Sequence, residues 1–307
     1  MRNAFADEIL KLAIADPRIV VLSGDIGNRL FDKFKVSCPN RFYNCGVAEA
    51  NMISMAAGLA SSGLRPVCYT ITPFVTTRCL EQIKVDVCYH HMPVVVVGTG
   101  SGLSYAALGA THHSFEDIAI MSVLPGMNVL APGDSNELRS SLRVAMTTES
   151  PSYIRIGKKG EPLVYPESPT FELGKWQTFR PGSRVAFLAA GNMLPVAVEA
   201  ADHLKENGID AAVIGCASIK PLDKGLLAEA SQKYDVIATL EEHSQIGGFG
   251  AAVASWMANH APGAPARLVQ FGIRDEFMHE AGEQEHARKL FGIDADSVVA
   301  KIRQVLA

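Results

Sequence analysis

One carboxylate stands alone in the segment 41–53, where a short strand pattern changes into a helical one. Glu49 is the only charged residue between Arg41 and Ile53, and its neighbours are mostly small or apolar. The simplest interpretation is a first-turn acid stabilised by the positive end of a helix dipole, an effect of a few tenths to about 1 kcal/mol. The alternative is a desolvated carboxyl group that shares a proton with a basic nitrogen, as acid–base chemistry requires.

Two adjacent histidines form a second candidate site. His112 and His113 follow the glycine-dotted segment 98–103 and precede an apolar run that predicts the start of a helix. Backbone N–H groups at such a start, together with two imidazoles, can bind substrate oxygens or an anion. A polar helix cap explains the same residues equally well. No third and fourth ligand match them, so the sequence predicts no metal site.

Arg155 is a charge embedded in the apolar segment 152–156, which predicts a strand. A buried guanidinium needs an anionic partner. A structural carboxylate satisfies this need, and so does a substrate phosphate, which the planar fork of arginine fits well. The sequence leaves both alternatives open.

The glycine-rich segment 247–250 follows Glu241, Glu242 and His243 and only superficially resembles a phosphate-binding loop. It has neither the GxxxxGK[ST] nor the GxGxxG spacing, so we predict a closely packed helix entry instead. The six cysteines include no C-x-x-C pair, which argues against a zinc or redox motif, and we expect them to act as small core residues.

The composition is that of an ordinary globular protein. The 307 residues include 28 Lys and Arg against 32 Asp and Glu, a net charge of −4, which argues against nucleic acid as the main partner. The longest apolar run, 92–97, is far shorter than the roughly 18 residues that a membrane-spanning helix needs. Acidic residues near the N-terminus do not fit a signal peptide, so we expect a cytoplasmic protein in a reducing compartment.

Apolar runs alternate with amphipathic, alanine-rich segments in the first half of the chain. Strands are predicted over 19–22, 67–71, 93–97, 127–130 and 152–156, and helices over 2–15, 48–62, 75–90, 114–123 and 134–147. This alternation is typical of an α/β domain with a largely parallel sheet.

A stretch rich in Gly, Lys and Pro at 157–181 predicts a connection. Beyond it the alternation resumes, with strands predicted over 184–190, 211–215, 236–240 and 267–271 and helices over 194–205, 223–232 and 248–259. The predicted fold class is α/β, with two three-layer domains of mostly parallel sheet. We place them at residues 1–165 and 181–307, with a linker at 166–180.

Four segments, 23–27, 39–49, 72–82 and 111–117, together resemble the thiamine-diphosphate-dependent transketolase family. The similarity extends over nearly the whole chain and is to the C-terminal half of these enzymes. It implies a pyrimidine-binding domain followed by the transketolase C-terminal domain. Related halves occur in deoxyxylulose-phosphate synthases and in the β subunits of 2-oxoacid dehydrogenases.

The resemblance also implies a partner chain. In this family, a Gly-Asp-Gly motif that ends in a distal Asn-Asn pair holds the cofactor diphosphate and Mg²⁺, and this sequence contains neither. We therefore expect an N-terminal subunit to carry the diphosphate and Mg²⁺ site. We further expect a homodimer of this subunit inside an α2β2 heterotetramer, because a cofactor shared between chains needs a large interface.

Individual residues match family positions. Glu49 matches the acid that hydrogen-bonds the aminopyrimidine ring, and His112 matches a histidine that contacts substrate oxygens, with His113 adjoining. The resemblance implies that further residues lie at the cofactor. These are Asp25, Ile26 as the apolar support of the bent cofactor, and Phe74 as the aromatic on the pyrimidine, with Tyr69 as its alternative. It also places Arg78 in the helix that lines the pocket and Arg155 at the sugar phosphate.

The sequence departs from the family where substrates are recognised. Residues 107–110 are Ala-Leu-Gly-Ala where transketolases carry an acidic Glu-Asp-Gly run, and Gly100 stands near the position of a phosphate-contacting histidine. The acceptor is therefore open, and a modified or non-phosphorylated sugar fits the pattern.

Three functions are consistent with these observations. The leading hypothesis is the C-terminal subunit of a split transketolase that transfers a two-carbon ketol unit between sugars. The second is a decarboxylating enzyme, of the 2-oxoacid dehydrogenase β or deoxyxylulose-phosphate synthase type. The third is a non-catalytic regulatory subunit that keeps the fold.

Overall fold

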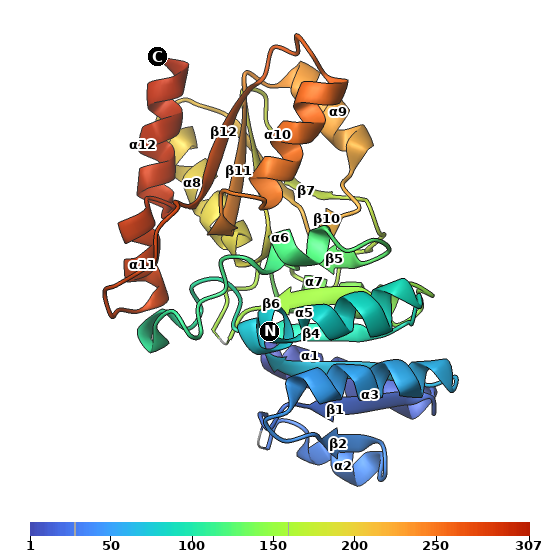
Figure 1. The fold of residues 1–307 in the computed structure, drawn as a ribbon. Helices are drawn as coiled ribbons and strands as arrows, with labels where there is room; N and C mark the ends of the chain where they lie inside the picture. The colour runs from blue at the N-terminus through green and yellow to red at the C-terminus, as the bar shows by residue number, and fades with distance from the viewer. Residues whose placement is uncertain (28, 159) are drawn as a thin grey trace.

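The computed structural model describes residues 1–27, 29–158 and 160–307. Two β-sheets lie one above the other in Figure 1, each with helices on both faces, and the C-terminus lies at the end away from the first strands. None of the described helices combines the length and apolar character that crossing a bilayer requires.

The first sheet is built almost entirely from the N-terminal half. Its strand order is β10-β5-β6-β4-β3-β1-β2, and every pairing is parallel except that of β10 with β5. The strands are β1 (Ile19–Ser23), β2 (Phe42–Asn44), β3 (Arg65–Ile71), β4 (Val95–Thr99), β5 (Asn128–Leu130), β6 (Ser152–Ile156) and β10 (Ser218–Lys220). The central strands are buried along their whole length, as expected for a parallel sheet covered on both faces.

The second sheet belongs to the C-terminal half. Its order is β12-β11-β8-β9-β7, and only β7 is antiparallel to its neighbour. The strands are β7 (Gln177–Arg180), β8 (Val185–Ala189), β9 (Ala211–Gly215), β11 (Val236–Ser244) and β12 (Arg267–Ile273). The two sheets confirm the predicted α/β class with mostly parallel strands.

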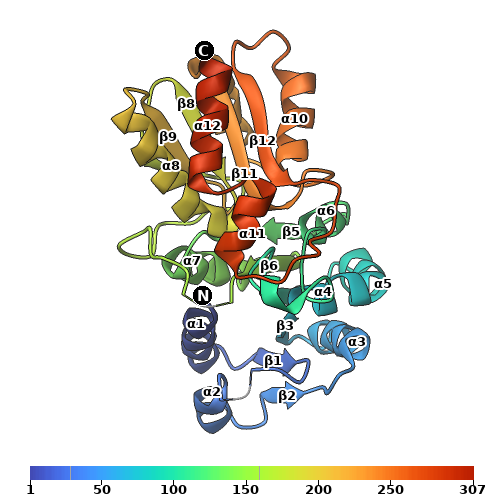
Figure 2. The same cartoon turned by 90° about the vertical axis from the view of Figure 1, so that its left-hand side faces the viewer.

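Helices cover both faces of each sheet. In the first half they are α1 (Arg2–Ala15), α2 (Asp32–Ser37), α3 (Glu49–Ser61), α4 (Thr72–Val75), α5 (Leu80–Gln82), α6 (Asp117–Ser122) and α7 (Ser135–Ala145), with short 3₁₀ turns η1 (Thr77–Cys79) and η3 (Ala106–Leu108) and a π-helical segment η2 (Ile83–Tyr89). In the second half they are η4 (Gly191–Met193), α8 (Leu194–Glu206), α9 (Lys224–Lys233), α10 (Phe249–His260), α11 (Gln284–Phe291) and α12 (Ala295–Leu306). Figure 2 shows α8 and α12 side by side on one face of the second sheet.

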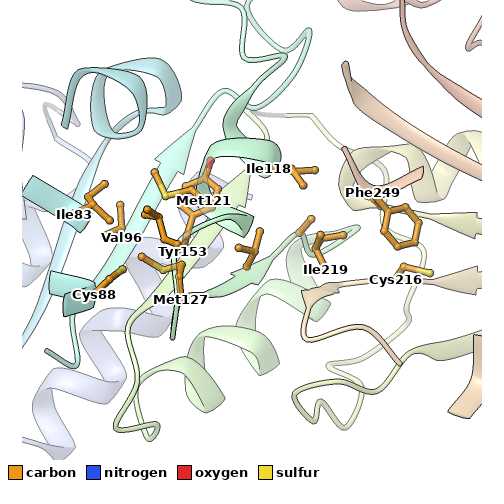
Figure 3. Close-up of a cluster of buried hydrophobic side chains, with 14 of the residues drawn as sticks. Ile83, Cys88, Val96, Ile118, Met121, Met127, Tyr153, Cys216, Ile219 and Phe249 are labelled. Atoms are coloured by element: carbon orange, nitrogen blue, oxygen red, sulfur yellow. The ribbon is translucent and has the colours of Figure 1, made fainter. Parts of the chain in front are cut away.

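One continuous hydrophobic core joins the two halves. It extends from residues such as Ile83 and Val96 beside the first sheet, through Ile118, to Ile219 and Phe249 beside the second (Figure 3). Strand β10 reinforces this contact because it leaves the second half of the chain to pair with the edge of the first sheet. The two halves therefore form a tightly packed pair.

Some element predictions differ from the structure. The segment predicted as one helix over 75–90 is broken into α4, η1, α5 and η2. The hydroxyls of Thr76 and Thr77 donate to the carbonyls of Thr72 and Pro73, both at 2.7 Å, and such side-chain bonds compete with a regular helix. Part of the predicted linker is strand β7, and α2, α11 and α12 were not predicted.

Candidate active site

The strand order of the first sheet reverses at β1. From β1 the chain crosses to β2 on one side, whereas β3 lies on the other side of β1 and leads on to β4. Ligands of open α/β sheets bind at such switch points, outside the carboxyl ends of the strands. The segment after β1, the start of α3 and the turns after β3 meet at this edge, so the topology alone identifies a candidate site.

Glu49 lies at this edge of the sheet. It is the first residue of α3 and is only 2% exposed. A Cβ added to Gly24, after β1, would lie 3.1 Å from Glu49 Cγ and 3.0 Å from Thr70 Oγ1 on β3. Glycine at position 24 therefore lets the chain after β1 approach Glu49 closely, and the carboxylate is enclosed between β1 and β3.

A single cation faces this carboxylate. Among the described residues, Glu49 accepts a side-chain hydrogen bond only from Arg78, whose Nη1 lies 3.0 Å from Glu49 Oε2. The Arg78 side chain is 46% exposed and its guanidinium carbon lies 4.2 Å from the centre of the Phe74 ring. Because Arg78 reaches solvent, its charge stays hydrated if another group takes its place at Glu49.

Aromatic and cationic side chains continue from this ion pair. The Phe74 ring centre lies 5.3 Å from that of His112, which lies 5.8 Å from that of Tyr105, both edge to face. The Lys158 ammonium lies 4.8 Å from the Tyr105 ring centre. We call these residues, from Glu49 and Arg78 to Lys158, the site row. It joins turns after β3, β4 and β6, which are neighbours in the sheet.

A cavity of about 480 Å³ opens beside the middle of the row. It is lined by Pro73, Phe74, Thr77, Arg78, Ala110, Thr111 and Glu116. Phe74 and Arg78 line this cavity, and Arg78 bonds to the buried Glu49. An aromatic ring and a carboxylate, the two groups that the aminopyrimidine ring implied by the family resemblance needs, are thus linked through one partly exposed arginine. No group of three or more metal-ligating side chains occurs among the described residues.

The turn after β1 holds two further predicted residues. Asp25 is exposed, has a positive φ of 55° and accepts a hydrogen bond from Asn44 Nδ2 at 3.0 Å. Ile26 is half-buried and packs against the core of the first sheet, and its carbonyl accepts from Ser23 Oγ at 2.8 Å. These contacts fix the turn after β1.

Tyr69, the alternative to Phe74, lies elsewhere. It is fully buried and its ring stacks on Phe5 at 5.2 Å between ring centres, inside the core. Phe74 is partly exposed and lines the cavity. Of the two aromatics, only Phe74 is placed to contact a ligand.

The two histidines differ sharply. His112 is half-buried in the site row, its Nδ1 lies 2.9 Å from Thr111 Oγ1, and burial together with the neighbouring His113 lowers its pKa. His113 is 4% exposed, stacks on Phe115 and bonds the carbonyl of Ala106 through Nε2 at 3.1 Å. His113 therefore lies behind the site row, where it lines a separate cavity of about 460 Å³.

Arg155 pairs with a carboxylate of the protein. Its side chain is 1% exposed, and it forms a bidentate pair with the fully buried Asp117, Nε to Oδ2 at 2.7 Å and Nη2 to Oδ1 at 3.0 Å. Nη2 also donates to the carbonyls of Ser114 and Glu242. The structural carboxylate, one of the two alternatives open from the sequence, therefore pairs with Nε and Nη2, whereas the buried Nη1 has no hydrogen-bond partner among the described residues. The phosphate-binding interpretation of Arg155 stays a prediction.

The glycine-rich segment 247–250 is a helix entry, as predicted. Gly248 precedes α10, and the backbone N–H groups of Phe249 and Gly250 donate to Glu241 at 2.7 Å each. A Cβ at Gly248 would overlap with Glu241 Oε2. The glycines thus allow a buried carboxylate to cap the helix.

Five of the six cysteines are buried, as expected for small core residues.

Four residues of the site and its supports were missed. Tyr105 and Lys158 extend the site row, Asp117 holds Arg155, and Glu242 contacts the loop before His112. Tyr105 and Lys158 had only a weak sequence signal, an aromatic in a glycine-dotted segment and a lysine just after a strand. Glu242 had a stronger signal, because it and Glu241 directly follow the apolar run 236–240. Acids at the end of a buried strand are expected to be buried only if they are paired.

Comparison with known proteins agrees with this geometry. Residues 1–161 match the transketolase pyrimidine-binding domain and residues 174–298 match the transketolase C-terminal domain. The chain is 34% identical over 307 residues to a putative transketolase C-terminal section of Methanocaldococcus jannaschii, covering 99% of this chain and 95% of that protein. It is 36% identical over 300 residues to one subunit of the apulose-4-phosphate transketolase of Phocaeicola vulgatus, covering 97% and 94%.

A solved structure leads to the same family. A split-gene transketolase described as an inactive β4 tetramer has a TM-score of 0.91 and 35% identity, covering 99% of this chain and 97% of that one. Both transketolase domains occur in this chain in that order, and the similar solved structure also belongs to a split-gene transketolase. The chain therefore belongs to the transketolase family and corresponds to the C-terminal subunit of its split members.

Proposed function

We propose that this chain forms, with an N-terminal partner subunit, a split transketolase that transfers a two-carbon ketol unit from a ketose donor to an aldose acceptor. The partner would hold the diphosphate and Mg²⁺, and this chain would hold the pyrimidine end of the cofactor. The observation that supports this proposal is Glu49, a buried carboxylate at the switch point of the first sheet that has, among the described residues, one partner, which reaches solvent. A homodimer of this subunit within an α2β2 heterotetramer completes the proposal.

Thiamine diphosphate supplies the nucleophilic carbon and the electron sink for this chemistry when it is bound. Glu49 Oε2, now bonded to Arg78, is placed to hold a proton shared with a nitrogen of the pyrimidine ring. Phe74 offers its ring face to the same ring, and the Asp25–Ile26 turn borders it on the β1 side. These residues bind and orient, which is the task that cofactor chemistry leaves to the protein.

His112 is placed to bind the substrate. Its lowered pKa favours the neutral imidazole, so one ring nitrogen donates and the other accepts, which suits carbonyl and hydroxyl oxygens. Lys158 ends the site row with a half-buried ammonium, which is a second candidate, besides Arg155, for the cation that binds an anionic sugar end. The apulose-4-phosphate enzyme to which the chain is similar acts on such a phosphorylated sugar, by its name.

Reconstitution tests this function. The chain and a transketolase N-terminal subunit encoded beside it would be purified separately, mixed with thiamine diphosphate and Mg²⁺, and assayed with ketose and aldose panels. We expect ketol transfer from the mixture and none from either subunit. Tight binding of thiamine diphosphate to this chain alone, measured by calorimetry, would contradict the split arrangement.

The decarboxylating alternative is tested in the same mixture. Pyruvate replaces the ketose, and release of CO₂ is followed. Faster turnover of pyruvate than of every ketose would assign the chain to the deoxyxylulose-phosphate synthase or 2-oxoacid dehydrogenase type instead. Turnover that is independent of this chain would indicate a regulatory subunit.

A further inference from the structure

The loop between β4 and α6 carries Tyr105 and His112 and is closed at its base. Ser114 N donates to Gly102 O at 3.1 Å, which forms an isolated antiparallel bridge. Much of the tip, residues 107–111, is exposed. The position of His112 therefore depends on what holds the base of this loop, which we call the histidine loop (103–113).

Glu242, from the second sheet, holds the first end. Its Oε2 accepts from Leu103 N at 3.0 Å, and the side chain is fully buried. Gly102 has a φ of +59°, and a Cβ there would lie 2.5 Å from Glu242 Cβ. Only glycine permits this approach, so the contact between the two halves of the chain is built into the loop.

The same residue holds the other end through its backbone. Glu242 O accepts from Arg155 Nη2 at 3.1 Å. Arg155 in turn donates to Ser114 O at 3.3 Å and pairs with Asp117, directly after the loop. The side chain of Glu242 thus fixes the start of the histidine loop, and its carbonyl, through Arg155, fixes the end.

Glu242 is itself immobilised by the second half of the chain. It accepts from Asn192 Nδ2 at 3.0 Å, from Gln284 Nε2 at 2.9 and 3.0 Å, and from Arg288 Nε at 2.6 Å. Arg288 compensates the buried charge and is only 16% exposed. Helix α11, which carries Gln284 and Arg288, packs against η3 of the histidine loop (Figure 2).

We propose that Glu242 is a positioning residue for His112, by which the C-terminal domain sets the geometry of the substrate-binding loop. The proposal rests on the proposed function for its kinetic consequence, but not for its structural one. Glu242 does not reach the site row; it acts through Leu103 N and Arg155. A domain without reacting groups would then influence the affinity for the sugar.

Glu242→Gln is the main test, and Glu241→Gln is its matched control. An amide has one acceptor oxygen and two donors, so it cannot serve the four donors that face Glu242. Glu241 is equally buried and adjacent, but among the described residues its hydrogen-bond donors are the N–H groups that begin α10, not the histidine loop. General destabilisation should affect both variants, whereas loosening of the loop should affect only the first.

Hydrogen exchange of the unmixed chain gives the first readout. We expect amides of 103–113 to exchange about tenfold faster or more in Glu242→Gln, because a bond to a charged acceptor is lost, and to be unchanged in Glu241→Gln. Equal exchange in the two variants would overturn the proposal. If Glu242→Gln does not fold, Gln284→Ala, which removes one part-exposed donor, should raise the same exchange rates about twofold to fivefold.

Kinetics of the reconstituted complex give the second readout. We expect the KM for the sugar bound by His112 to rise about tenfold in Glu242→Gln, with kcat and the affinity for thiamine diphosphate within about threefold of the parent. A fall in kcat alone, or an equal change in Glu241→Gln, would contradict a positioning role. An inactive parent complex would refute the proposed function, while the exchange experiment would still decide whether Glu242 holds the loop.

Discussion

Two ion pairs of the first half of the chain, Glu49–Arg78 and Asp117–Arg155, each contain a buried carboxylate, and they differ in how deeply the arginine is buried. In the first, one partner is 46% exposed and the carboxylate has one hydrogen bond from a described side chain. In the second, both side chains are 1% exposed or less, Asp117 is also bonded by Tyr153 at 2.6 Å, and Arg155 spans four acceptor atoms.

This difference separates a site from a scaffold. Burial raises the pKa of Asp117, but the charge and hydrogen bonds of Arg155 outweigh it and hold that pKa below its usual range. Both side chains of this pair are desolvated, and removing one partner leaves an unpaired buried charge. Among the described residues, only the buried Nη1 of Arg155 in this pair lacks a hydrogen-bond partner. Glu49 and Arg78 retain free hydrogen-bonding capacity, and Arg78 lines a cavity, which is what ligand binding needs.

Replacing Glu49 should have the largest effect on activity. Glu49→Gln keeps the size of the side chain but removes the charge that holds a proton. We expect ketol transfer by the reconstituted complex to fall about 10²–10⁴-fold, and the free energy of unfolding of this chain to change by less than about 1 kcal/mol, because Arg78 reaches solvent. Initial rates and urea unfolding measure the two quantities. Unchanged turnover would favour a regulatory subunit.

Asp117→Asn should show the opposite pattern. Arg155 would remain buried without its counter-ion, which costs about 3–5 kcal/mol of unfolding free energy. The folded-state pKa of Asp117 is lowered, so its contribution is present above the unfolded-state pKa and is lost as the pH falls through the folded-state value. Urea unfolding between about pH 7 and pH 3 measures both effects.

The control for Asp117→Asn is Asp7→Asn. Asp7 also pairs with arginine, Arg139, but its side chain is 49% exposed, so the expected loss is below about 1 kcal/mol. Equal losses in the two variants would show that burial does not distinguish these ion pairs.

Much of the fold was predictable, and much of the hydrogen-bond network was not. Periodicity located the central strands because parallel strands buried on both faces read as apolar runs. Glu49 was identifiable because a lone acid among apolar residues is rare. The sequence could not decide whether Arg155 binds a protein carboxylate or a ligand, because its partner, Asp117, is 38 residues away in the chain. Strand β10 was missed because its partner, β5, lies in the other half of the chain.

Glu137 represents a third condition, a buried carboxylate with no ion pair among the described residues. It is 1% exposed and accepts from Gly133 N at 2.6 Å, and burial raises its pKa from 4.5 to about 7. Such a raised pKa contributes stability below the unfolded-state pKa, and this contribution is lost as the pH rises through about 7. The shift corresponds to at most about 3 kcal/mol.

Glu137→Gln isolates this contribution. The variant cannot ionise at this position, whereas the parent loses stability as the pH rises. We therefore expect the difference in unfolding free energy, variant minus parent, to be about 1–3 kcal/mol larger at about pH 8 than at about pH 5. Urea unfolding at the two pH values measures the difference. Glu241, whose pKa burial likewise raises to about 7, is present in both proteins and cancels in the comparison. A difference that does not change with pH would show that Glu137 is ionised in the folded chain at both pH values.

Arg78→Lys should have the smallest effect and most directly tests whether the Glu49 pair is open. Lysine keeps a positive charge near Glu49 but lacks the planar group that lies 4.2 Å from the Phe74 ring centre. Loss of that contact at an exposed site is worth about 0.5–1 kcal/mol, so the affinity of the complex for thiamine diphosphate should fall about twofold to fivefold. Unfolding of this chain should be unchanged within about 0.5 kcal/mol. Calorimetric titration of the complex measures the affinity. A loss of several kcal/mol in stability would place Arg78 with Arg155, as part of the scaffold, and would remove the contrast between the two pairs.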